Sequence, residues 1–266
     1  MTTAPLWFDA KKLRRHRQRA AHGFADHAFL HARAASDCGD RLEEINRSFA
    51  RVLAYGGGPA LHSALSRRAL RDKIREIWTG DCCEPLANGP LAMVFDPEHS
   101  PLASGALNLI VSCLSLHWVN DLPGALVQAR LALAHDGLFL GVLFGAATLQ
   151  ELREALLQAE AQLGNGASLR IAPFADCQDM SGLLQRAGFS LCVADADAVT
   201  VRYSDPLAAP RDVPATGETA AFHQPARPLT RAVLARAMEI YAERFSDPDG
   251  RVRASFELIT ATGWAL

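Results

Sequence analysis

The segment from Asn108 to Pro123, NLIVSCLSLHWVNDLP, joins a strand-like apolar run to residue types that can do chemistry. Its nearly continuous apolar first half is typical of a strand buried on both faces. His117, Trp118 and Asp121 follow that run. Because open α/β sheets bind ligands beyond the carboxyl ends of their strands, we predict that these three side chains bind substrate. A core strand followed by a helix cap would produce the same pattern without a ligand.

His117 is the candidate for proton transfer. An imidazole titrates near neutral pH and can act as a general base, which makes His117 a candidate catalytic residue. A histidine next to a tryptophan is also commonly a packed, hydrogen-bonded core residue. The sequence leaves both interpretations open.

Three consecutive glycines, Gly56, Gly57 and Gly58, lie between an apolar run at 51–55 and a helix-like segment. Strand, glycines and helix form the first βα unit of a doubly wound sheet. Glycines at that position let the backbone approach a nucleotide at the amino terminus of the helix. A tight turn without any ligand gives the same local pattern.

Acidic residues end the next two predicted strands. Asp81 follows a strand at 76–79, and Asp96 follows a strand at 91–95. An acid at the end of the second strand, about 20 residues beyond the glycines, can accept hydrogen bonds from both hydroxyls of a ribose. Asp81 could instead cap the following helix. The agreement between glycines and acids at successive strand ends favours a nucleotide-like ligand.

The remaining patterns complete a doubly wound α/β domain. Further strands are predicted at 107–113, 138–144, 189–193, 199–203 and in the tail 255–266, and helices at 123–134, 149–163, 179–187 and 230–245. Thr148 and Glu151 have the spacing of a capping box. Residues 204–228 hold five prolines and predict a long irregular connection. We therefore divide the chain into a basic helical extension (1–45), a Rossmann-like domain (46–203) and a proline-rich connection, helix and strand packed on that domain (204–266).

Composition limits the classes of function. Of 266 residues, 49% are hydrophobic and 21% are charged, as expected for a folded globular protein. The net charge of −2 argues against a nucleic-acid partner. The six cysteines form no zinc-binding spacing, so we predict no metal and a reducing cytoplasm. No apolar run reaches the roughly 18 residues of a membrane span. The basic run at 11–19 is either a solvated helix face or a contact for an acidic protein, a lipid surface or RNA.

Several segments resemble one branch of the class I S-adenosylmethionine-dependent methyltransferases. They are FDAKKLRRHRQRAA, SCLSLHWVNDLPGAL, HDGLFLGVLFGAATLQELREAL, IAPFADCQDMSGLLQRAGF and DGRVRASFELITATGW. This branch holds the mitochondrial complex I assembly factor 5 and its alphaproteobacterial relatives, and its neighbours are the malonyl-carrier-protein methyltransferases of biotin synthesis. The resemblance spans nearly the whole chain. It implies a seven-stranded, Rossmann-like sheet with an N-terminal helical extension and a C-terminal helical lobe.

The resemblance also implies roles for individual residues. Gly56 and Gly58 would line the methionine part of S-adenosylmethionine, Asp81 would hold the ribose hydroxyls, and Asp96 would meet the adenine amino group. Residues 115–118 would separate cofactor from substrate. The implied cofactor-binding set is Gly56, Gly57, Gly58, Asp81, Cys82, Asp96 and Ser115.

Three positions depart from the family pattern. Ala54 stands where the family usually carries an acid, Ala60 where a third glycine is usual, and Asn108 where an aspartate is common at the start of the fourth strand. Losing one acceptor for a charged ammonium costs roughly 1.5 to 3 kcal/mol, or about ten- to a hundredfold in affinity. We therefore predict S-adenosylmethionine as the cofactor, with binding weakened or lost.

Three hypotheses follow, and the sequence does not decide between enzyme and non-enzyme. In the first, the chain methylates or hydroxylates a side chain of a protein. The resemblance implies that this side chain is an arginine of a respiratory complex I subunit. In the second, it methylates a small-molecule carboxyl group, as in biotin synthesis. In the third, it is a cofactor-poor assembly chaperone. The expected setting is a bacterial cytoplasm, at the periphery of the inner membrane, with the oligomeric state left open.

Overall fold

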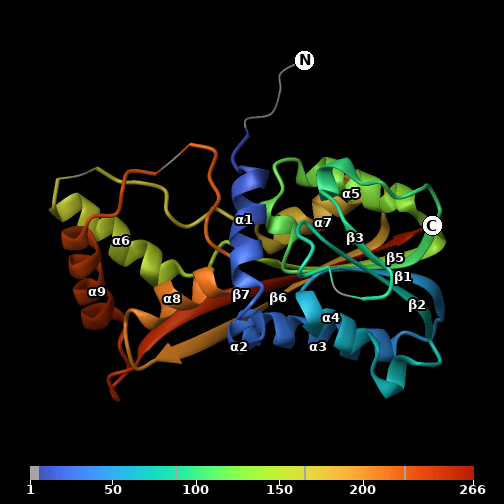
Figure 1. Cartoon of the computed structure of the whole chain (residues 1–266), viewed down its shortest axis with the longest axis horizontal. Coiled ribbons are helices and arrows are strands. Elements are labelled where there is room, and N and C mark those ends of the chain that lie inside the picture. Colours follow the sequence, from blue (N-terminus) through green and yellow to red (C-terminus); the bar gives the residue numbers. More distant parts are fainter. Residues whose placement is uncertain (1–5, 88, 165, 225) are drawn as a thin grey trace.

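A seven-stranded sheet forms the centre of the molecule (Figure 1). The computed structural model describes residues 6–266 except 88, 165 and 225, so the first five residues of the predicted N-terminal extension lie outside it. The strands are ordered β3-β2-β1-β4-β5-β7-β6. Their bounds are β1 Phe49–Gly56, β2 Ile74–Asp81, β3 Ala92–Val94, β4 Leu107–Cys113, β5 Leu133–Phe144, β6 Ser190–Tyr203 and β7 Val252–Ala265.

Strands β1 to β5 are paired in parallel, and β7 is antiparallel to both β5 and β6. The strand order reverses between β1 and β4, and ligand crevices of open α/β sheets form at such a reversal. The carboxyl ends of β1, β2 and β4 therefore meet at one edge. This arrangement confirms the predicted seven-stranded α/β fold.

Helices cover both faces of the sheet. Their bounds are α1 Ala10–Ala20, α2 Phe24–His27, α3 Phe29–Glu44, α4 Gly58–Leu65, α5 Leu122–Ala132, α6 Gln150–Gln162, α7 Cys177–Arg186, α8 Ala208–Ala215 and α9 Arg231–Phe245, with 3₁₀ turns η1 Arg68–Leu70, η2 Pro97–His99 and η3 Leu116–Trp118. In Figure 1, α5 and α7 lie above the sheet, α3 and α4 lie below it, and α6, α8 and α9 form a lobe where β6 and β7 extend furthest.

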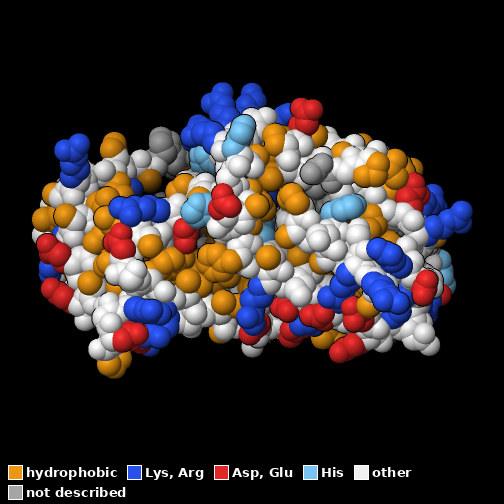
Figure 2. Space-filling view, turned by 60° about the horizontal axis from the view of Figure 1, so that its bottom comes forward, with side chains coloured by type: hydrophobic (Ala, Val, Ile, Leu, Met, Phe, Trp, Pro, Cys, Tyr) orange, Lys and Arg blue, Asp and Glu red, His pale blue; other side chains and the backbone are white. Residues whose placement is uncertain are grey.

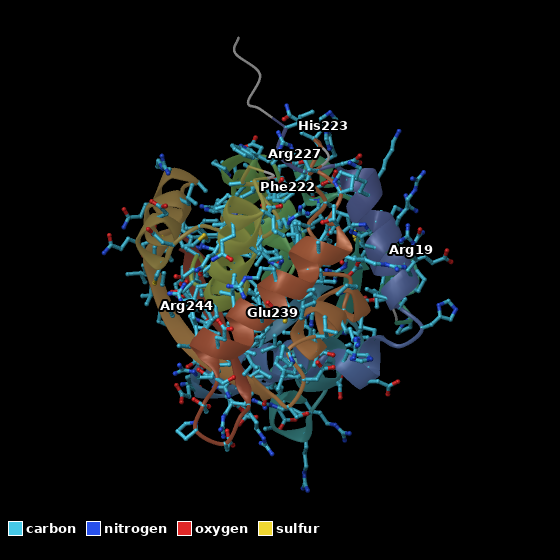
Figure 3. The ribbon with its side chains drawn as sticks, turned by 90° about the vertical axis from the view of Figure 1, so that its left-hand side faces the viewer. Arg19, Phe222, His223, Arg227, Glu239 and Arg244 are labelled. Atoms are coloured by element: carbon cyan, nitrogen blue, oxygen red, sulfur yellow. The ribbon has the colours of Figure 1, made fainter. Side chains whose placement is uncertain are left out.

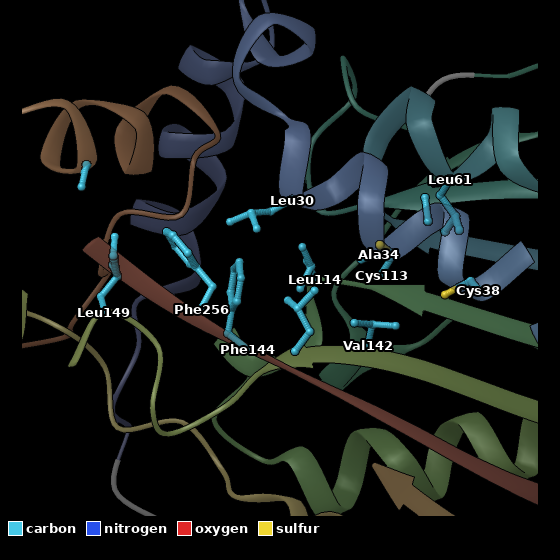
Figure 4. Packing of buried hydrophobic residues seen from close by; sticks show 14 of the residues in the cluster. Leu30, Ala34, Cys38, Leu61, Cys113, Leu114, Val142, Phe144, Leu149 and Phe256 are labelled. Atoms are coloured by element: carbon cyan, nitrogen blue, oxygen red, sulfur yellow. The ribbon is translucent and has the colours of Figure 1, made fainter. Parts of the chain in front are cut away.

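Two apolar clusters pack on the sheet, one on each face, and a third, smaller cluster forms around Phe24. Leu109 and Val111 of β4 belong to the cluster between the sheet and helices α3 and α4. Ile110 belongs to the cluster between the sheet and helices α5 and α7. Figure 4 shows the first cluster, with Cys38 of α3 and Leu61 of α4 facing the sheet. Because β4 is buried on both faces, its apolar run is continuous, as predicted.

One long edge strand replaces two predicted strands. Residues 190–203 form β6, which pairs with β7 from Val193 to Tyr203 without a turn. The acids that interrupt the apolar pattern are held by α3, because Arg41 donates to Asp195 (2.9 Å) and Arg33 donates to Asp197 (2.7 Å). The separate strands predicted at 189–193 and 199–203 were therefore wrong.

The predicted capping box of α6 is also absent. The Thr148 hydroxyl donates to the carbonyl oxygen of Glu257 (3.2 Å), and Glu151 Oε2 accepts from the backbone N–H of Ser255 (3.0 Å). Both side chains tie α6 to β7, which satisfies them through tertiary contacts that the local spacing could not reveal.

Residues 204–228 are not wholly irregular, because they contain α8. Pro210 lies in the first turn of that helix, where a missing N–H costs no hydrogen bond. The proline count therefore overstated the irregularity of this segment.

Candidate functional site

The three glycines make the turn from β1 into α4. Gly56, Gly57 and Gly58 have φ values of +71°, +68° and +55°, a region that favours glycine. A Cβ on Gly56 would lie 2.6 Å from the carbonyl oxygen of Cys113 and 2.7 Å from Cβ of Ser115. The turn is thus pressed against the end of β4, and it lies beside Ser115.

Asp81 ends β2 and is fully buried. Its Oδ1 accepts from the backbone N–H of Cys83 (3.2 Å), and its Oδ2 accepts from Nη2 of Arg17 (3.1 Å). Arg17 comes from α1 and is 1% exposed. The basic run predicted α1, but no signal in the run singles out its one buried arginine.

Four donors converge on the carboxylate of Glu218, which lies in the segment after α8. Oε1 accepts from Arg17 Nη1 (3.1 Å) and His31 Nε2 (3.3 Å), and Oε2 accepts from His117 Nε2 (2.9 Å) and Trp118 Nε1 (2.6 Å). All five side chains are buried. The predicted His117 and Trp118 therefore meet at an acid that the sequence had not placed in the site. We call Arg17, His31, Asp81, His117, Trp118 and Glu218 the Glu218 cluster.

Burial and pairing fix the charge states of this cluster. Burial raises the pKa of Glu218, but hydrogen bonds from His117 and His31 and the charge of Arg17 hold that pKa well below its usual range. Burial lowers the pKa of His117 more than Glu218 raises it, so His117 is neutral at pH 7. Burial also lowers the pKa of Arg17, but Asp81 and Glu218 raise it above its usual value. Two carboxylates against one guanidinium leave one net negative charge.

The cluster retains unused polar atoms. Because ionised Glu218 only accepts, neutral His117 must donate through Nε2–H, which leaves Nδ1 as its basic atom. Among the described residues, His117 Nδ1, His31 Nδ1 and Arg17 Nε are buried without a hydrogen-bond partner. Buried polar atoms are nearly always satisfied, so these atoms indicate a place where a bound group could complete the network.

The other predicted site residues lie outside the cluster. Asp96 accepts from the backbone N–H of Glu98 (3.0 Å), and Asp121 accepts from that of Gly124 (2.8 Å), so each caps the helix that follows it. Cys82 lies next to Asp81, and its hydrogen bond to Cys83, burial and the charge of Asp81 all raise its pKa, which keeps the thiol protonated.

A cavity opens beside the cluster, between the sheet and the C-terminal lobe. Its walls include the aromatic rings of Trp118, Phe144, Phe174 and Phe256 and the carboxylates of Asp212 and Glu218. Figure 4 shows Phe144 and Phe256 side by side, pointing toward Leu30 at the start of α3.

The family's cofactor cleft is filled by the chain itself. Phe24 of α2 is 3% exposed and covers Gly58, where a Cβ would lie 3.0 Å from the phenyl ring. Phe24 packs with Ala28 and Cys83, and Arg17 covers Asp81. In this conformation Arg17 covers Asp81 and Phe24 covers the glycine turn, so neither is open to a bound group.

The sheet order and the glycine turn define the class I methyltransferase fold. The YcgJ protein from Bacillus subtilis shares the fold with a TM-score of 0.57 and 14% identity over 86% of this chain and 97% of that one. A methyltransferase from Bacillus halodurans shares it with a TM-score of 0.54 and 14% identity over 86% of this chain and 98% of that one. No family model matches the chain.

Sequence similarity identifies the branch. Human mitochondrial arginine-hydroxylase NDUFAF5 is 32% identical over 243 residues, which cover 89% of this chain and 70% of that protein, and the Danio rerio protein is 31% identical over 89% and 75%. The malonyl-[acyl-carrier protein] O-methyltransferase of Laribacter hongkongensis is 29% identical over 98% of this chain and 91% of that protein. The chain belongs to the arginine-hydroxylase NDUFAF5 family, which confirms the resemblance seen in the sequence.

The described residues were also compared with the requirements of a membrane-spanning helix and of a metal site. Within the described part of the chain, no helix is long and apolar enough to cross a membrane. The same residues contain no group of three or more His, Cys, Asp or Glu side chains placed to hold a metal ion.

Proposed function

We propose that the chain is an enzyme that modifies an arginine side chain of a protein; its NDUFAF5 relatives are named arginine-hydroxylases. The observation that carries this proposal is the aromatic cavity beside the Glu218 cluster, where the carboxylate of Asp212 is 26% exposed and Glu218 adds negative charge. The aromatic walls suit the alkyl stem and the flat guanidinium of an arginine, because guanidinium groups bind favourably over aromatic faces. Carboxylates supply the acceptors that a guanidinium requires.

The geometry of the cavity supports a cationic substrate. Phe174 packs edge-on against Trp118, with ring centroids 5.5 Å apart, and lies 6.2 Å from the ring of Phe144. Asp212 also lines the cavity, and its side chain is 26% exposed and hydrogen-bonded to His27 (3.0 Å). Glu218 lies at the inner end, in a cluster with net negative charge. Figure 2 shows hydrophobic side chains gathered on the half of the molecule that holds α6, α8 and α9.

An anionic malonyl substrate fits the cavity less well. Such a substrate needs a cation to receive its carboxylate. Arg170 lines the cavity, but its Nε donates to Glu160 (2.9 Å) and its Nη2 forms a second bond to the same carboxylate. Its charge is therefore already paired. The charge of the walls favours arginine over the carboxyl methylation named for the Laribacter relative.

His117 supports the aromatic wall of the cavity and carries a nitrogen atom that can accept a proton. Its ring packs edge-on against Phe144 and Phe174, with centroids 4.9 and 5.0 Å away, so it supports the aromatic wall. Its Nε2 proton is held by Glu218, and Nδ1 is free to accept a proton. We propose a general-base role for His117, whose ring packs against Phe144 and Phe174 of the cavity wall, together with substrate contacts of Trp118, which lines the cavity.

The remaining expectations belong to the same proposal. The fold supports S-adenosylmethionine as cofactor, with Gly56, Gly57, Gly58 and Asp81 among its proposed contacts. The relatives support a protein partner, which we propose to be a subunit of respiratory complex I at the inner face of a bacterial inner membrane. The filled cleft supports the alternative of a cofactor-free chaperone, and the same experiment separates the two.

Calorimetry with three short peptides tests the substrate class. An arginine peptide should bind the protein, and the matched lysine and citrulline peptides should bind about tenfold or more weakly, because a bidentate charged contact is lost. Asp212→Asn should weaken arginine binding, whereas Glu154→Gln, on the exposed face of α6, should not. Equal binding of all three peptides, or tighter binding of a malonyl thioester, would overturn the proposal.

Mass spectrometry then tests the reaction. After coexpression with complex I subunits, one arginine should gain either one methyl group from S-adenosylmethionine or one oxygen atom from dioxygen. In the second case a cellular reductant reduces the other oxygen atom to water. His117→Gln should abolish the gain. Stable capture of a subunit that remains unmodified would favour the chaperone.

A further inference from the structure

We propose that Asp81 and Glu218 form a guanidinium-binding site that Arg17 occupies, and that this internal occupant closes the cofactor cleft. The proposal concerns the residues that hold α1 in place and is independent of the arginine substrate. We call the two carboxylates the clamp, and residues 9–27, which carry Arg17 and Phe24, the lid.

The clamp uses both terminal nitrogens of one guanidinium. Arg17 Nη1 donates to Glu218 and Nη2 donates to Asp81, each at 3.1 Å. The two carboxylates come from distant segments, the end of β2 and the residues after α8, and neither faces solvent. A planar guanidinium is suited to bridge two carboxylates in this way. Arg17 therefore joins the cofactor side of the site to the substrate side.

The backbone around Arg17 is closely fitted. Gly217 has a φ of +79°, and a Cβ there would lie 2.9 Å from the Cα of Arg17. The Lys12 ammonium donates to the carbonyl oxygen of Phe222 (2.9 Å), and His16 Nδ1 lies 3.2 Å from that of Thr219. The helix thus lies along the segment that presents Glu218.

Helix α1 has little apolar surface to hold it there. Its buried residues are Arg17 and Ala20, and most of its other side chains are basic. Figure 3 shows Arg19 on the outer side of this helix. A buried ion pair contributes little net stability, because desolvation of the charges offsets their attraction. The helix is anchored at its start, where Phe8 bridges to Phe222, and its remaining contacts are mainly polar, so it can hinge open from that anchor without unfolding the core.

Opening would release both halves of the nucleotide site. Asp81 Oδ2, which the fold assigns to a ribose hydroxyl, now accepts from Arg17. Phe24, at the far end of the lid, covers Gly58. A cofactor that needs Asp81 and the glycine turn competes with the lid. Its apparent affinity is therefore its intrinsic affinity multiplied by the fraction of molecules that are open.

Titration calorimetry with S-adenosylmethionine tests the closure. Arg17→Met keeps the length of the side chain and removes its charge, and it should bind about tenfold or more tightly than wild type, because the open fraction rises. Arg19→Met, on the outer side of the same helix, should bind as wild type does. Phe24→Ala leaves the clamp intact and should also tighten binding. Wild-type affinity equal to that of both Arg17→Met and Phe24→Ala would overturn the proposal.

Chemical rescue tests the guanidinium site directly. Arg17→Ala should melt below wild type, and methylguanidine should raise its melting temperature by more than it raises that of wild type, in which Arg17 already fills the clamp. Sodium chloride at the same ionic strength should not raise the melting temperature of Arg17→Ala. Failure of methylguanidine to raise the melting temperature of Arg17→Ala would refute the clamp.

Hydrogen exchange on wild type offers a check without substitution. Saturating S-adenosylmethionine should speed amide exchange in α1, and unchanged exchange with bound cofactor would refute the lid. None of these readouts depends on arginine modification, so they can fail or succeed separately from the proposed function.

Discussion

Replacing Glu218 by glutamine removes one charge and reverses one hydrogen-bonding group at the centre of the cluster. Four donors point at the carboxylate in the folded protein. The amide of Glu218→Gln would direct its own N–H groups against two of them. Arg17 would keep Asp81 but lose its second carboxylate, so a buried charge would become partly unpaired.

The expected cost follows from burial. Removing one partner from a buried ion pair costs about 3 to 5 kcal/mol, and the remaining bond to Asp81 places this case near the lower end. For a chain of this size, about 3 kcal/mol corresponds to a fall in melting temperature of about 6 to 12 °C. Glu239→Gln is the matched control, because Glu239 pairs with Arg236 on the surface of α9 with its side chain 60% exposed. Such surface changes stay within about 0.5 kcal/mol.

Scanning calorimetry at neutral and acidic pH measures both effects. The folded pKa of Glu218 lies well below its ordinary value of 4.5, so its stabilisation is full above that value and is lost as the pH falls toward the folded pKa. The gap between wild type and Glu218→Gln should therefore narrow below about pH 4. A Glu218→Gln protein that melts no lower than Glu239→Gln at neutral pH would refute the cluster as a source of stability.

Two further predictions concern the glycine turn and His117. Gly56→Ala and Gly105→Ala share backbone strain of about 1 to 3 kcal/mol, but only the first meets a neighbour, since nothing lies within 4 Å of a Cβ placed on Gly105. Gly56→Ala should therefore unfold at a lower urea concentration than Gly105→Ala. Equal unfolding midpoints for the two variants would contradict the close packing of the turn. The folded pKa of His117 lies below 6.5, so its contribution to stability grows as the pH rises toward the unfolded value and is lost as the pH falls. His117→Gln should flatten the rise of melting temperature between about pH 5 and 7, and an unchanged slope would mean that His117 does not titrate as inferred.

The sheet was largely predictable because its signals are local. Strand β4 begins at Leu107 and ends at Cys113, the bounds that its apolar run predicted. The glycine turn was equally visible, since three left-handed residues in succession leave few alternatives to glycine. Where a side chain had a choice of partner, local spacing failed, and Glu151 bonds to Ser255 instead of capping its own helix.

The site was predictable only in part, because its members come from distant segments. His117 and Trp118 could be singled out from their place after a buried strand. Their partner Glu218 follows about a hundred residues later in the chain, in a segment with little periodicity. Arg17 lies in a basic run, and such a run is usually a solvated face. Only the packing of α1 decides which of its charges is buried.

The departure at Ala54 can be understood together with Arg17. Ala54 is buried and pairs with Thr79, two residues before Asp81 on the neighbouring strand. The acid usual in the family at this position would lie on the same face of the sheet as Asp81 and add another buried negative charge near the clamp. Like charges in a buried site oppose each other's ionisation, so one guanidinium could not balance three carboxylates. With alanine there, Asp81 and Glu218 retain a single excess charge. We infer that the loss of the acid favours the closed lid, in which Arg17 alone balances the two carboxylates of the clamp.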